Sequence, residues 1–152
     1  VGKSTLASNL AAYASSKGLK TTIIDLDPQS SLTAWYGLRL RHSDDVELLI
    51  KGMPLVDQIK QQAKAGFDLC IIDTPPHNST EAATAVRVSD ITIVPVRASA
   101  FDLIASKPTF ELLASGKGGV VLNAVPSSSA VKDSAIDFVK QSGLKVLAVI
   151  GQ

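Results

Sequence analysis

The sequence predicts an α/β fold in which a doubly wound, mostly parallel sheet carries helices on both faces. Stretches whose apolar residues have helical spacing alternate with short, mostly apolar stretches along the 152 residues. Two of these short stretches, residues 21–24 and 69–72, run directly into an aspartate and a loop that contains proline. Because alternating helices and strands are joined by right-handed crossovers, we expect parallel strands.

The composition is that of one globular domain. The chain has 152 residues, 45% of them hydrophobic, which is enough for a substantial core, and we predict a single domain over residues 1–152. The net charge of +1 creates no overall field for nucleic acid, so any DNA contact would need a local patch. The single cysteine, Cys70, excludes an internal disulfide and is typical of a reducing cytosol. The apolar run around it is too short to span a bilayer.

The first half of the chain reads as three helices and two strands. Leu6, Leu10 and Ala14 predict a helix from the start of the chain, which the sequence Ser-Lys-Gly at residues 16–18 ends. A strand is expected over residues 21–24, then a helix over 31–38 and an exposed, charged connection over 39–45. The next helix, residues 54–65, has its apolar residues at Leu55, Val56, Ile59 and Ala63, and a strand over 67–73 follows.

The second half repeats the pattern. We predict helices over residues 81–88, 101–114 and 131–141, and strands over 91–96, 119–125 and 145–150. Pro108 is expected to kink or break the second of these helices. Residues 115–119, Ser-Gly-Lys-Gly-Gly, are similar to a phosphate-binding loop. Because a strand and not a helix is predicted after them, we expect these residues to form a turn. Ser127, Ser128 and Ser129 predict a polar loop and helix cap.

The opening residues 1–5, Val-Gly-Lys-Ser-Thr, are typical of the end of a phosphate-binding loop that passes into a helix. Gly2 lets the backbone approach a phosphate, Lys3 can reach the β and γ oxygens, and the Ser4 hydroxyl can ligate Mg²⁺. Thr5 lies with the first-turn N–H groups at the positive end of the helix dipole. A full loop also needs a strand and further residues before Gly2, so we expect the sequence to be a fragment.

Three loops are expected at one edge of the sheet, because the carboxyl ends of parallel strands meet there. They are the opening loop, residues 25–29 and residues 73–76. Asp73 follows an apolar strand and offers Mg²⁺ a fixed oxygen ligand near the phosphates. Asp27 is then available to orient or polarise the attacking water. Asp25 is expected to cap the strand end or to hydrogen-bond the loop, and turn formation is the alternative for Asp27 and Asp73.

Together these motifs resemble those of the ParA-type partition ATPases, members of the deviant P-loop group (P-loop NTPases with a deviant Walker A motif) that also includes MinD. The resemblance lies in residues 1–5, in Asp-Leu-Asp-Pro-Gln at 25–29 and in the strand and loop over 67–76. Residues 93–96 and 101–103 are similar to a strand and the following helix of the ParA branch. The resemblance implies that the sequence lacks the first strand, part of the phosphate-binding loop and the C-terminal helices of the domain.

The resemblance also implies the site and its cofactors, ATP and Mg²⁺. Gly2, Lys3, Ser4 and Thr5 would bind the nucleotide, with Thr5 touching the α-phosphate and Ser4 ligating the metal. Asp27 would activate or place the water, with Lys3 as the second catalytic residue. Asp73 would hold the metal through its water shell, and Asn123 is similar to a position near the base in some relatives.

The function that the resemblance implies is an ATP-hydrolysing switch for plasmid or chromosome partitioning. Such a protein forms a homodimer in the ATP state, binds DNA nonspecifically, works with a centromere-binding ParB-like adaptor and is cytoplasmic and nucleoid-associated, with no membrane partner. A family lysine that crosses to the partner's nucleotide would precede residue 1, so this fragment should bind ATP poorly.

Three other functions are alternatives for a protein with this fold. The first is a MinD-like, membrane-associated positioning ATPase, against which Pro28 and Gln29 argue. An iron–sulfur electron carrier of the same fold is excluded, because Cys70 alone cannot bridge a cluster. A non-catalytic, nucleotide-gated scaffold for some other cargo is the third.

For the two histidines and two of the arginines, an exposed loop position is favoured over a role in ligand binding. His42 and His77 have no second ligand at metal spacing and are expected in exposed loops. Arg39 and Arg41 could touch DNA phosphates, but a solvated loop is the favoured interpretation.

Overall fold

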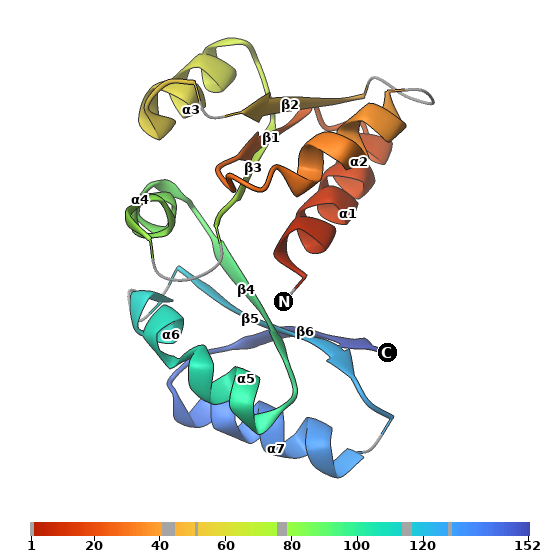
Figure 1. The fold of residues 1–152 in the computed structure, drawn as a ribbon, viewed down its shortest axis with the longest axis vertical. Helices are drawn as coiled ribbons and strands as arrows, with labels where there is room; N and C mark the ends of the chain where they lie inside the picture. The colour runs from red at the N-terminus through yellow and green to blue at the C-terminus, as the bar shows by residue number, and fades with distance from the viewer. Residues whose placement is uncertain (1, 41–44, 51, 76–78, 114–116, 128) are drawn as a thin grey trace. The chain divides into compact units, whose positions relative to one another are not determined.

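The computed structural model describes residues 2–40, 45–50, 52–75, 79–113, 117–127 and 129–152 (Figure 1). The chain contains two compact units, one of residues 3–88 and one of residues 89–152 together with the first two residues. Each unit is an arrangement of parallel strands and helices, which confirms the α/β class, while the single domain over 1–152 stays a prediction. Several residues named in the sequence predictions lie outside the described ones: Val1, Arg41, His42, Pro76, His77, Ser115, Gly116 and Ser128.

The unit of residues 3–88 has a three-stranded parallel sheet in the order β2-β1-β3. Helix α1 contacts all three strands and packs with α2, so it covers one face of this sheet (Figure 1). In chain order its elements are α1 (Lys3–Ser16), β1 (Thr21–Asp25), α2 (Ser31–Arg39), β2 (Val46–Ile50), α3 (Leu55–Lys64), β3 (Leu69–Asp73) and α4 (Thr80–Val88).

Strand β1 is the centre of this unit, and every one of its five residues is buried. Burial on both faces is typical of a central parallel strand, which explains why its sequence does not alternate apolar and polar residues. Thr21 and Thr22 are tolerated there because their hydroxyls donate hydrogen bonds to the carbonyls of Leu19 and Glu47, at 2.9 and 3.2 Å. The apolar core beside it consists of Ala11, Ile23, Leu32 and Val46.

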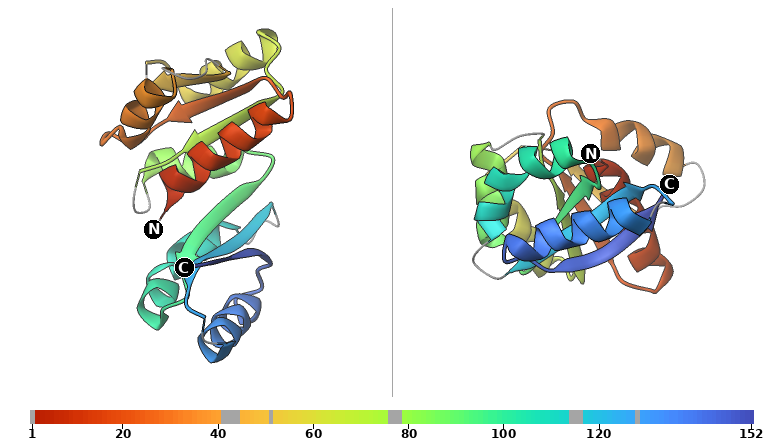
Figure 2. Two further views of the ribbon diagram at one scale, coloured as in Figure 1. Left: turned by 90° about the vertical axis from the view of Figure 1, so that its right-hand side faces the viewer. Right: turned by 90° about the horizontal axis from the view of Figure 1, so that it is seen from below.

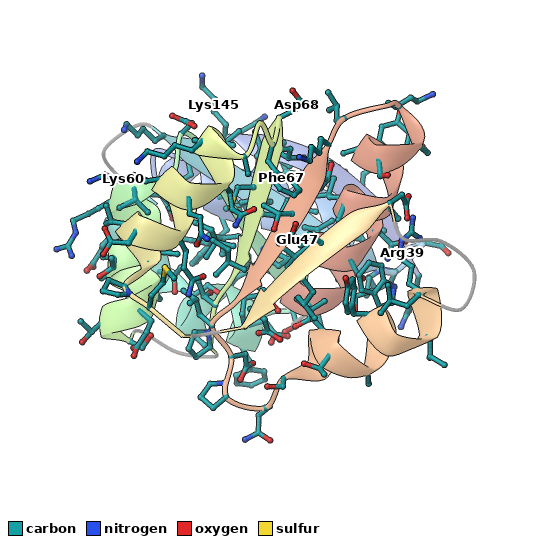
Figure 3. All side chains as sticks on the ribbon, turned by 90° about the horizontal axis from the view of Figure 1, so that it is seen from above. Arg39, Glu47, Lys60, Phe67, Asp68 and Lys145 are labelled. Atoms are coloured by element: carbon teal, nitrogen blue, oxygen red, sulfur yellow. The ribbon has the colours of Figure 1, made fainter. Side chains whose placement is uncertain are left out.

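The strand β3 begins at Leu69, two residues later than predicted. Phe67 and Asp68, labelled in Figure 3, lie before the strand. Both contact Lys20, the residue just before β1. The Lys20 ammonium lies 4.3 Å from the centroid of the Phe67 ring, and the Lys20 backbone N–H donates to Asp68 at 2.8 Å. These contacts align the starts of β1 and β3, so that their ends also meet.

The strand β2 was not predicted. The predicted connection ended at Asp45, and no element was assigned to residues 46–53. Within β2 the buried Val46 and the exposed Glu47 alternate, as expected for an outer strand. Arg39, predicted in the exposed connection, ends α2 and forms an ion pair of 2.5 Å with Asp45. The Ser15 hydroxyl also donates to Asp45, so the pair ties α2 to α1.

Helix α3 is present, but its predicted apolar face is partly wrong. Val56 is 40% exposed, while Gln58 and Gln62 are buried. The less exposed face of α3 consists of residues 55, 58, 59 and 62, which have helical spacing. Residues 56 and 63 lie outside this face and are exposed. The Gln58 amide donates to the Met53 carbonyl at 3.1 Å, which partly compensates its burial.

The unit of residues 89–152 has a second parallel sheet, in the order β4-β5-β6. Helix α7 contacts β5 and β6, and α5 contacts β4 and α7 (Figures 1 and 2). Its core includes Val96, Leu103, Phe110, Leu122 and Val139. The elements are β4 (Thr92–Arg97), α5 (Ala100–Ala105), α6 (Lys107–Leu113), β5 (Gly118–Val125), α7 (Ser129–Gln141) and β6 (Val146–Gly151).

The expected break at Pro108 is confirmed, because α5 ends before Ser106 and α6 begins after it. Proline has no N–H to donate to the carbonyl of Ile104, and its ring would clash with that carbonyl in a continuous helix. Ser99 starts α5 by accepting a hydrogen bond from the Asp102 N–H at 3.1 Å.

Gly118 and Gly119 belong to β5. The predicted turn over 115–119 is therefore wrong for Gly118, while Gly119 lies in the strand predicted over 119–125, which is confirmed. A Cβ atom on Gly118 would collide with the Thr92 carbonyl oxygen of the neighbouring strand. One on Gly119 would lie 2.6 Å from the Lys145 carbonyl oxygen. The glycines therefore permit close approach of neighbouring chain segments. From the sequence alone, glycines required for such an approach could not be distinguished from glycines of a turn.

Within the described ranges, none of the helices combines the length and the apolar character that crossing a bilayer requires.

Candidate functional site

The candidate site lies at the carboxyl end of the β2-β1-β3 sheet. β1 and β3 pair in parallel with Asp25 opposite Asp73, so both strands end in an aspartate at the same level. The Leu26 N–H donates to the Asp73 carbonyl at 2.9 Å and extends the pairing one residue beyond β1. Because neighbouring strands lie about 4.8 Å apart, the two strand ends present their carboxylates side by side.

Ser4 joins the start of α1 to this edge. Its hydroxyl donates a hydrogen bond of 2.5 Å to Oδ2 of Asp73, whose side chain is only 3% exposed. Lys3, the first residue of α1, is close enough to Asp73 for its positive charge to lower the pKa of that carboxyl. Lys3, Ser4 and Asp73, predicted to act together, are therefore brought together.

The loop after β1 is held by two aspartate side chains in succession. Oδ1 of Asp25 accepts the Asp27 N–H at 2.9 Å, and Oδ1 of Asp27 accepts the Gln29 N–H at 2.9 Å. The first of these bonds confirms the expectation that Asp25 hydrogen-bonds the loop. Asp25 is buried and Asp27 is partly exposed, so of the two only Asp27 is open to a solute.

Burial dominates the electrostatics of the two strand-end carboxyls and raises the pKa of each. For Asp73, the Ser4 hydrogen bond lowers the pKa, the Asp25 charge raises it, and smaller effects come from Lys3 and Asp27. For Asp25, the Asp27 N–H lowers the pKa and the Asp27 carboxylate raises it. Three carboxylates in mutual repulsion, two of them buried, form a group that an added cation would stabilise.

These shifts predict how stability depends on pH. A carboxyl whose pKa is raised on folding binds more protons in the folded state, so stability falls as pH rises from its unfolded to its folded pKa. We therefore expect Asp73→Asn to be more stable than wild type at pH 7 without nucleotide, because the substitution removes a buried charge. The advantage should shrink as pH falls through the raised pKa. Thermal melts from pH 7 to pH 4.5 measure it.

Asp137→Asn is the control, because Asp137 is an exposed helix residue whose substitution should leave the melting temperature unchanged across this range. A constant difference between Asp73→Asn and wild type at every pH would contradict the assignment of the raised pKa to burial.

Gly2 and Asn123 form a second pairing, within the unit that contains residues 89–152. Gly2 has φ +86°, which favours glycine, and a Cβ there would lie 2.5 Å from Nδ2 of Asn123. Oδ1 of Asn123 accepts the N–H of Ala124 at 2.9 Å. Thr5 is exposed on α1, where its carbonyl accepts hydrogen bonds from Ser8 and Asn9.

The residues at the sheet edge fit a hydrated Mg²⁺. Among the described residues, no group of three or more His, Cys, Asp or Glu side chains is arranged to hold a metal ion by itself. Mg²⁺ does not need such a group, because it keeps several waters and takes one or two protein ligands together with phosphate oxygens. Ser4 and Asp73 place a hydroxyl and a carboxylate within 2.5 Å of each other, and both are oxygen donors of the kind that Mg²⁺ prefers.

An α/β fold with the Gly-Lys-Ser-Thr helix start beside two strand-end aspartates defines a nucleotide-binding protein of the P-loop class. The particular family is given by sequence comparison. The profile of the CobQ/CobB/MinD/ParA nucleotide binding domain, CbiA, matches residues 1–152, and the chain belongs to this family.

Named relatives cover different shares of the chain. The chain is 26% identical over 155 residues to maintenance of carboxysome distribution protein A of Halothiobacillus neapolitanus, with 96% of this chain and 71% of that protein covered. It is 31% identical over 133 residues to the chromosome-partitioning ATPase Soj of Thermus thermophilus, with 68% of this chain and 53% of that protein covered. The chain thus spans about half the length of Soj.

Solved structures agree on the fold. A plasmid partition protein of Borrelia burgdorferi bound to AMPPNP matches with a TM-score of 0.76 at 17% identity, covering 100% of this chain and 82% of that one. The MinD cell division protein of Aquifex aeolicus in its MinC complex matches with a TM-score of 0.78 at 19% identity, covering 99% and 76%.

Proposed function

We propose that this chain is the nucleotide-binding part of a Mg²⁺-dependent ATPase that acts as a molecular switch in plasmid or chromosome partitioning. The observation that carries the proposal is the 2.5 Å hydrogen bond between Ser4 and Asp73, with Asp27 on the adjoining loop. A hydroxyl at a helix start and a carboxylate at a strand end are the two protein oxygens that a P-loop nucleotidase uses around its metal. The names of Soj and of the Borrelia plasmid partition protein support the partitioning role.

Each predicted residue has a distinct task in this proposal. Lys3 neutralises charge on the β- and γ-phosphates, which its position at the helix start allows. Ser4 and Asp73 hold Mg²⁺, Ser4 directly and Asp73 through water; when bound, the ion supplies electrostatic stabilisation of the transferred phosphoryl group. Asp27, open to solvent and fixed by the Asp25 and Gln29 hydrogen bonds, orients the attacking water.

The remaining predicted residues bind other parts of the nucleotide. Gly2 lets the backbone approach the phosphates, because no Cβ is in the way. Thr5 contacts the α-phosphate, and Asn123 lies near the base. These three assignments rest on the resemblance to the family, and the exposure of Thr5 is compatible with its role.

The partners follow from the same resemblance. We propose a homodimer in the ATP state, nonspecific DNA binding by that dimer, and stimulation by a ParB-like adaptor, in a cytoplasmic, nucleoid-associated protein with no membrane partner. ATP would act as the switch because each state of the nucleotide favours a different assembly.

A second candidate is the positioning of a cargo other than DNA. The relatives named for carboxysome distribution and the fold shared with MinD favour it. Pro28 and Gln29 follow Asp27 here and argue against the membrane-associated MinD branch.

Two sedimentation assays on the purified protein separate these functions. For the partition switch, we expect the protein to sediment with long duplex DNA of unrelated sequence when Mg²⁺-ATP is present, and to remain in solution with ADP. Raising the salt concentration should weaken the binding, because phosphate contacts release counterions. ATP-dependent sedimentation with anionic liposomes instead of DNA would contradict the partition role and support the MinD-like alternative.

A further inference from the structure

Asn123 lies at the last position where β5 pairs with β4, at the carboxyl end of both strands. Ligands of parallel α/β sheets bind beyond this end. The Asn123 amide lies against Gly2 of the opening motif, which belongs to the same compact unit. A Cβ atom on Gly2 would be only 2.5 Å from Nδ2, too close for a real side chain. The amide therefore occupies the space beside the bare Cα of the glycine.

The backbone after Asn123 is irregular in a way that orients this side chain. Between Leu122 and Val125, β5 has one more residue than the paired segment of β6, which is a β-bulge. Ala124 lies inside the bulge with φ +50°, a left-handed conformation that residues with a Cβ rarely adopt. Its N–H donates to Oδ1 of Asn123 at 2.9 Å. Bulges and strained residues of this kind are common beside functional sites, where they re-aim a side chain.

The orientation of the amide leaves its nitrogen available at the opening motif. Because Oδ1 accepts the Ala124 N–H, the group that faces Gly2 is the NH₂ group. Among the described residues, none accepts a hydrogen bond from Nδ2. Asn123 is only partly buried, so a ligand has access to it. Two N–H donors thus lie next to the glycine that is proposed to approach the phosphates.

We propose that Asn123 is a positioning residue of the phosphate-binding loop. Its amide, oriented by the Ala124 N–H, packs against Gly2 and fixes the point at which the loop meets the phosphates. The inference rests on the proposed nucleotide site and deepens it, since Asn123 acquires a task at the phosphates in addition to its contact with the base. Asn123 then contributes to the binding of a ligand that has phosphates and no base.

Inorganic tripolyphosphate separates the two tasks, because it carries the phosphates of ATP without the base. Calorimetric titration gives the dissociation constants of Mg²⁺-tripolyphosphate and of a non-hydrolysable ATP analogue with Mg²⁺. We expect Asn123→Ala to weaken both ligands by the same factor, about 3- to 10-fold, the range for losing one uncharged hydrogen-bonding group. Asn123→Asp keeps an oxygen for the Ala124 N–H but places a carboxylate beside the loop, so it should weaken both ligands further.

Gln141→Ala is the matched control, because Gln141 is an exposed amide at the end of α7 in the same unit. Both of its dissociation constants should equal those of wild type. A loss confined to the ATP analogue would overturn the inference and leave Asn123 as a contact of the base only. Wild type that bound the analogue but not tripolyphosphate would overturn it as well. Wild type that bound neither ligand would instead contradict the proposed function itself.

A second measurement needs no variant and so does not depend on how a variant folds. In wild type, the side-chain NH₂ resonances of Asn123 should shift on addition of Mg²⁺-tripolyphosphate, and those of Gln141 should not. Unshifted Asn123 resonances at saturating tripolyphosphate would overturn the inference.

Discussion

Replacing Lys3 by alanine is expected to lower the affinity for Mg²⁺-ATP about 100-fold or more and to abolish measurable hydrolysis. Lys3 is the charged residue of the opening motif, and its field already reaches the Asp73 carboxylate. A charge-assisted hydrogen bond contributes about 1.5–3 kcal/mol, and Lys3 is proposed to reach two phosphates. Removing it also takes away the positive charge that lowers the pKa of the Asp73 carboxyl, so Lys3 no longer offsets the repulsion between this carboxylate and the anionic nucleotide.

Lys17→Ala is the matched control for this variant. Lys17 lies just after the same helix, with its ammonium 5.3 Å from the Tyr13 ring centroid and no proposed role at the site. Titration with a fluorescent ATP analogue and a phosphate-release assay give the two readouts. If Lys3→Ala bound and hydrolysed ATP like Lys17→Ala, the opening motif would be an ordinary helix start.

Replacing Asp27 by asparagine is expected to reduce ATP hydrolysis about 100- to 10,000-fold, the range found for positioned acid–base groups. The affinity for ATP should change little, because Asp27 is proposed to act on the water and not on the nucleotide. Asparagine can still accept the Gln29 N–H that Asp27 accepts at 2.9 Å, so the loop is expected to keep its conformation. The loss of rate then measures the contribution of the Asp27 carboxylate to hydrolysis, separate from its role in the loop.

Single-turnover hydrolysis with saturating Mg²⁺-ATP measures this effect, and Asp137→Asn serves as the control on an exposed aspartate. Asp27→Ala, which also removes the turn, should be at least as slow. Hydrolysis by Asp27→Asn at the normal rate would show that another group places the water.

The parts of the site that sequence predicted best are those fixed by short-range chemistry. Parallel pairing aligns strand ends, so Asp25 and Asp73, each directly after an apolar run, were expected to meet if both runs were neighbouring strands of one sheet. The helix that begins at Lys3 follows from its apolar spacing, and the break before Pro108 follows from the missing N–H of proline.

What the sequence did not predict depends on contacts between distant residues. Strand β2 is identified by its pairing, in which Val46 lies opposite Thr21, because a short apolar run such as residues 46–50 does not by itself distinguish a strand from a helix. The burial of Gln58 and Gln62 in α3 likewise depends on how the helix packs, which here outweighs the general preference of apolar residues for the core. The contact between Asn123 and Gly2 has no sequence signal at all, because the two residues lie far apart in the chain.

The central claim is that Lys3, Ser4, Asp27 and Asp73 surround one metal-bound triphosphate. A crystal structure of the protein with Mn²⁺ in place of Mg²⁺ and a non-hydrolysable ATP analogue tests it most directly, because the anomalous signal locates the ion. The account predicts one Mn²⁺ bonded to the Ser4 hydroxyl and to the phosphates, with the Asp73 carboxylate reached through water. An ion bound elsewhere, or a triphosphate away from the start of α1, would contradict it.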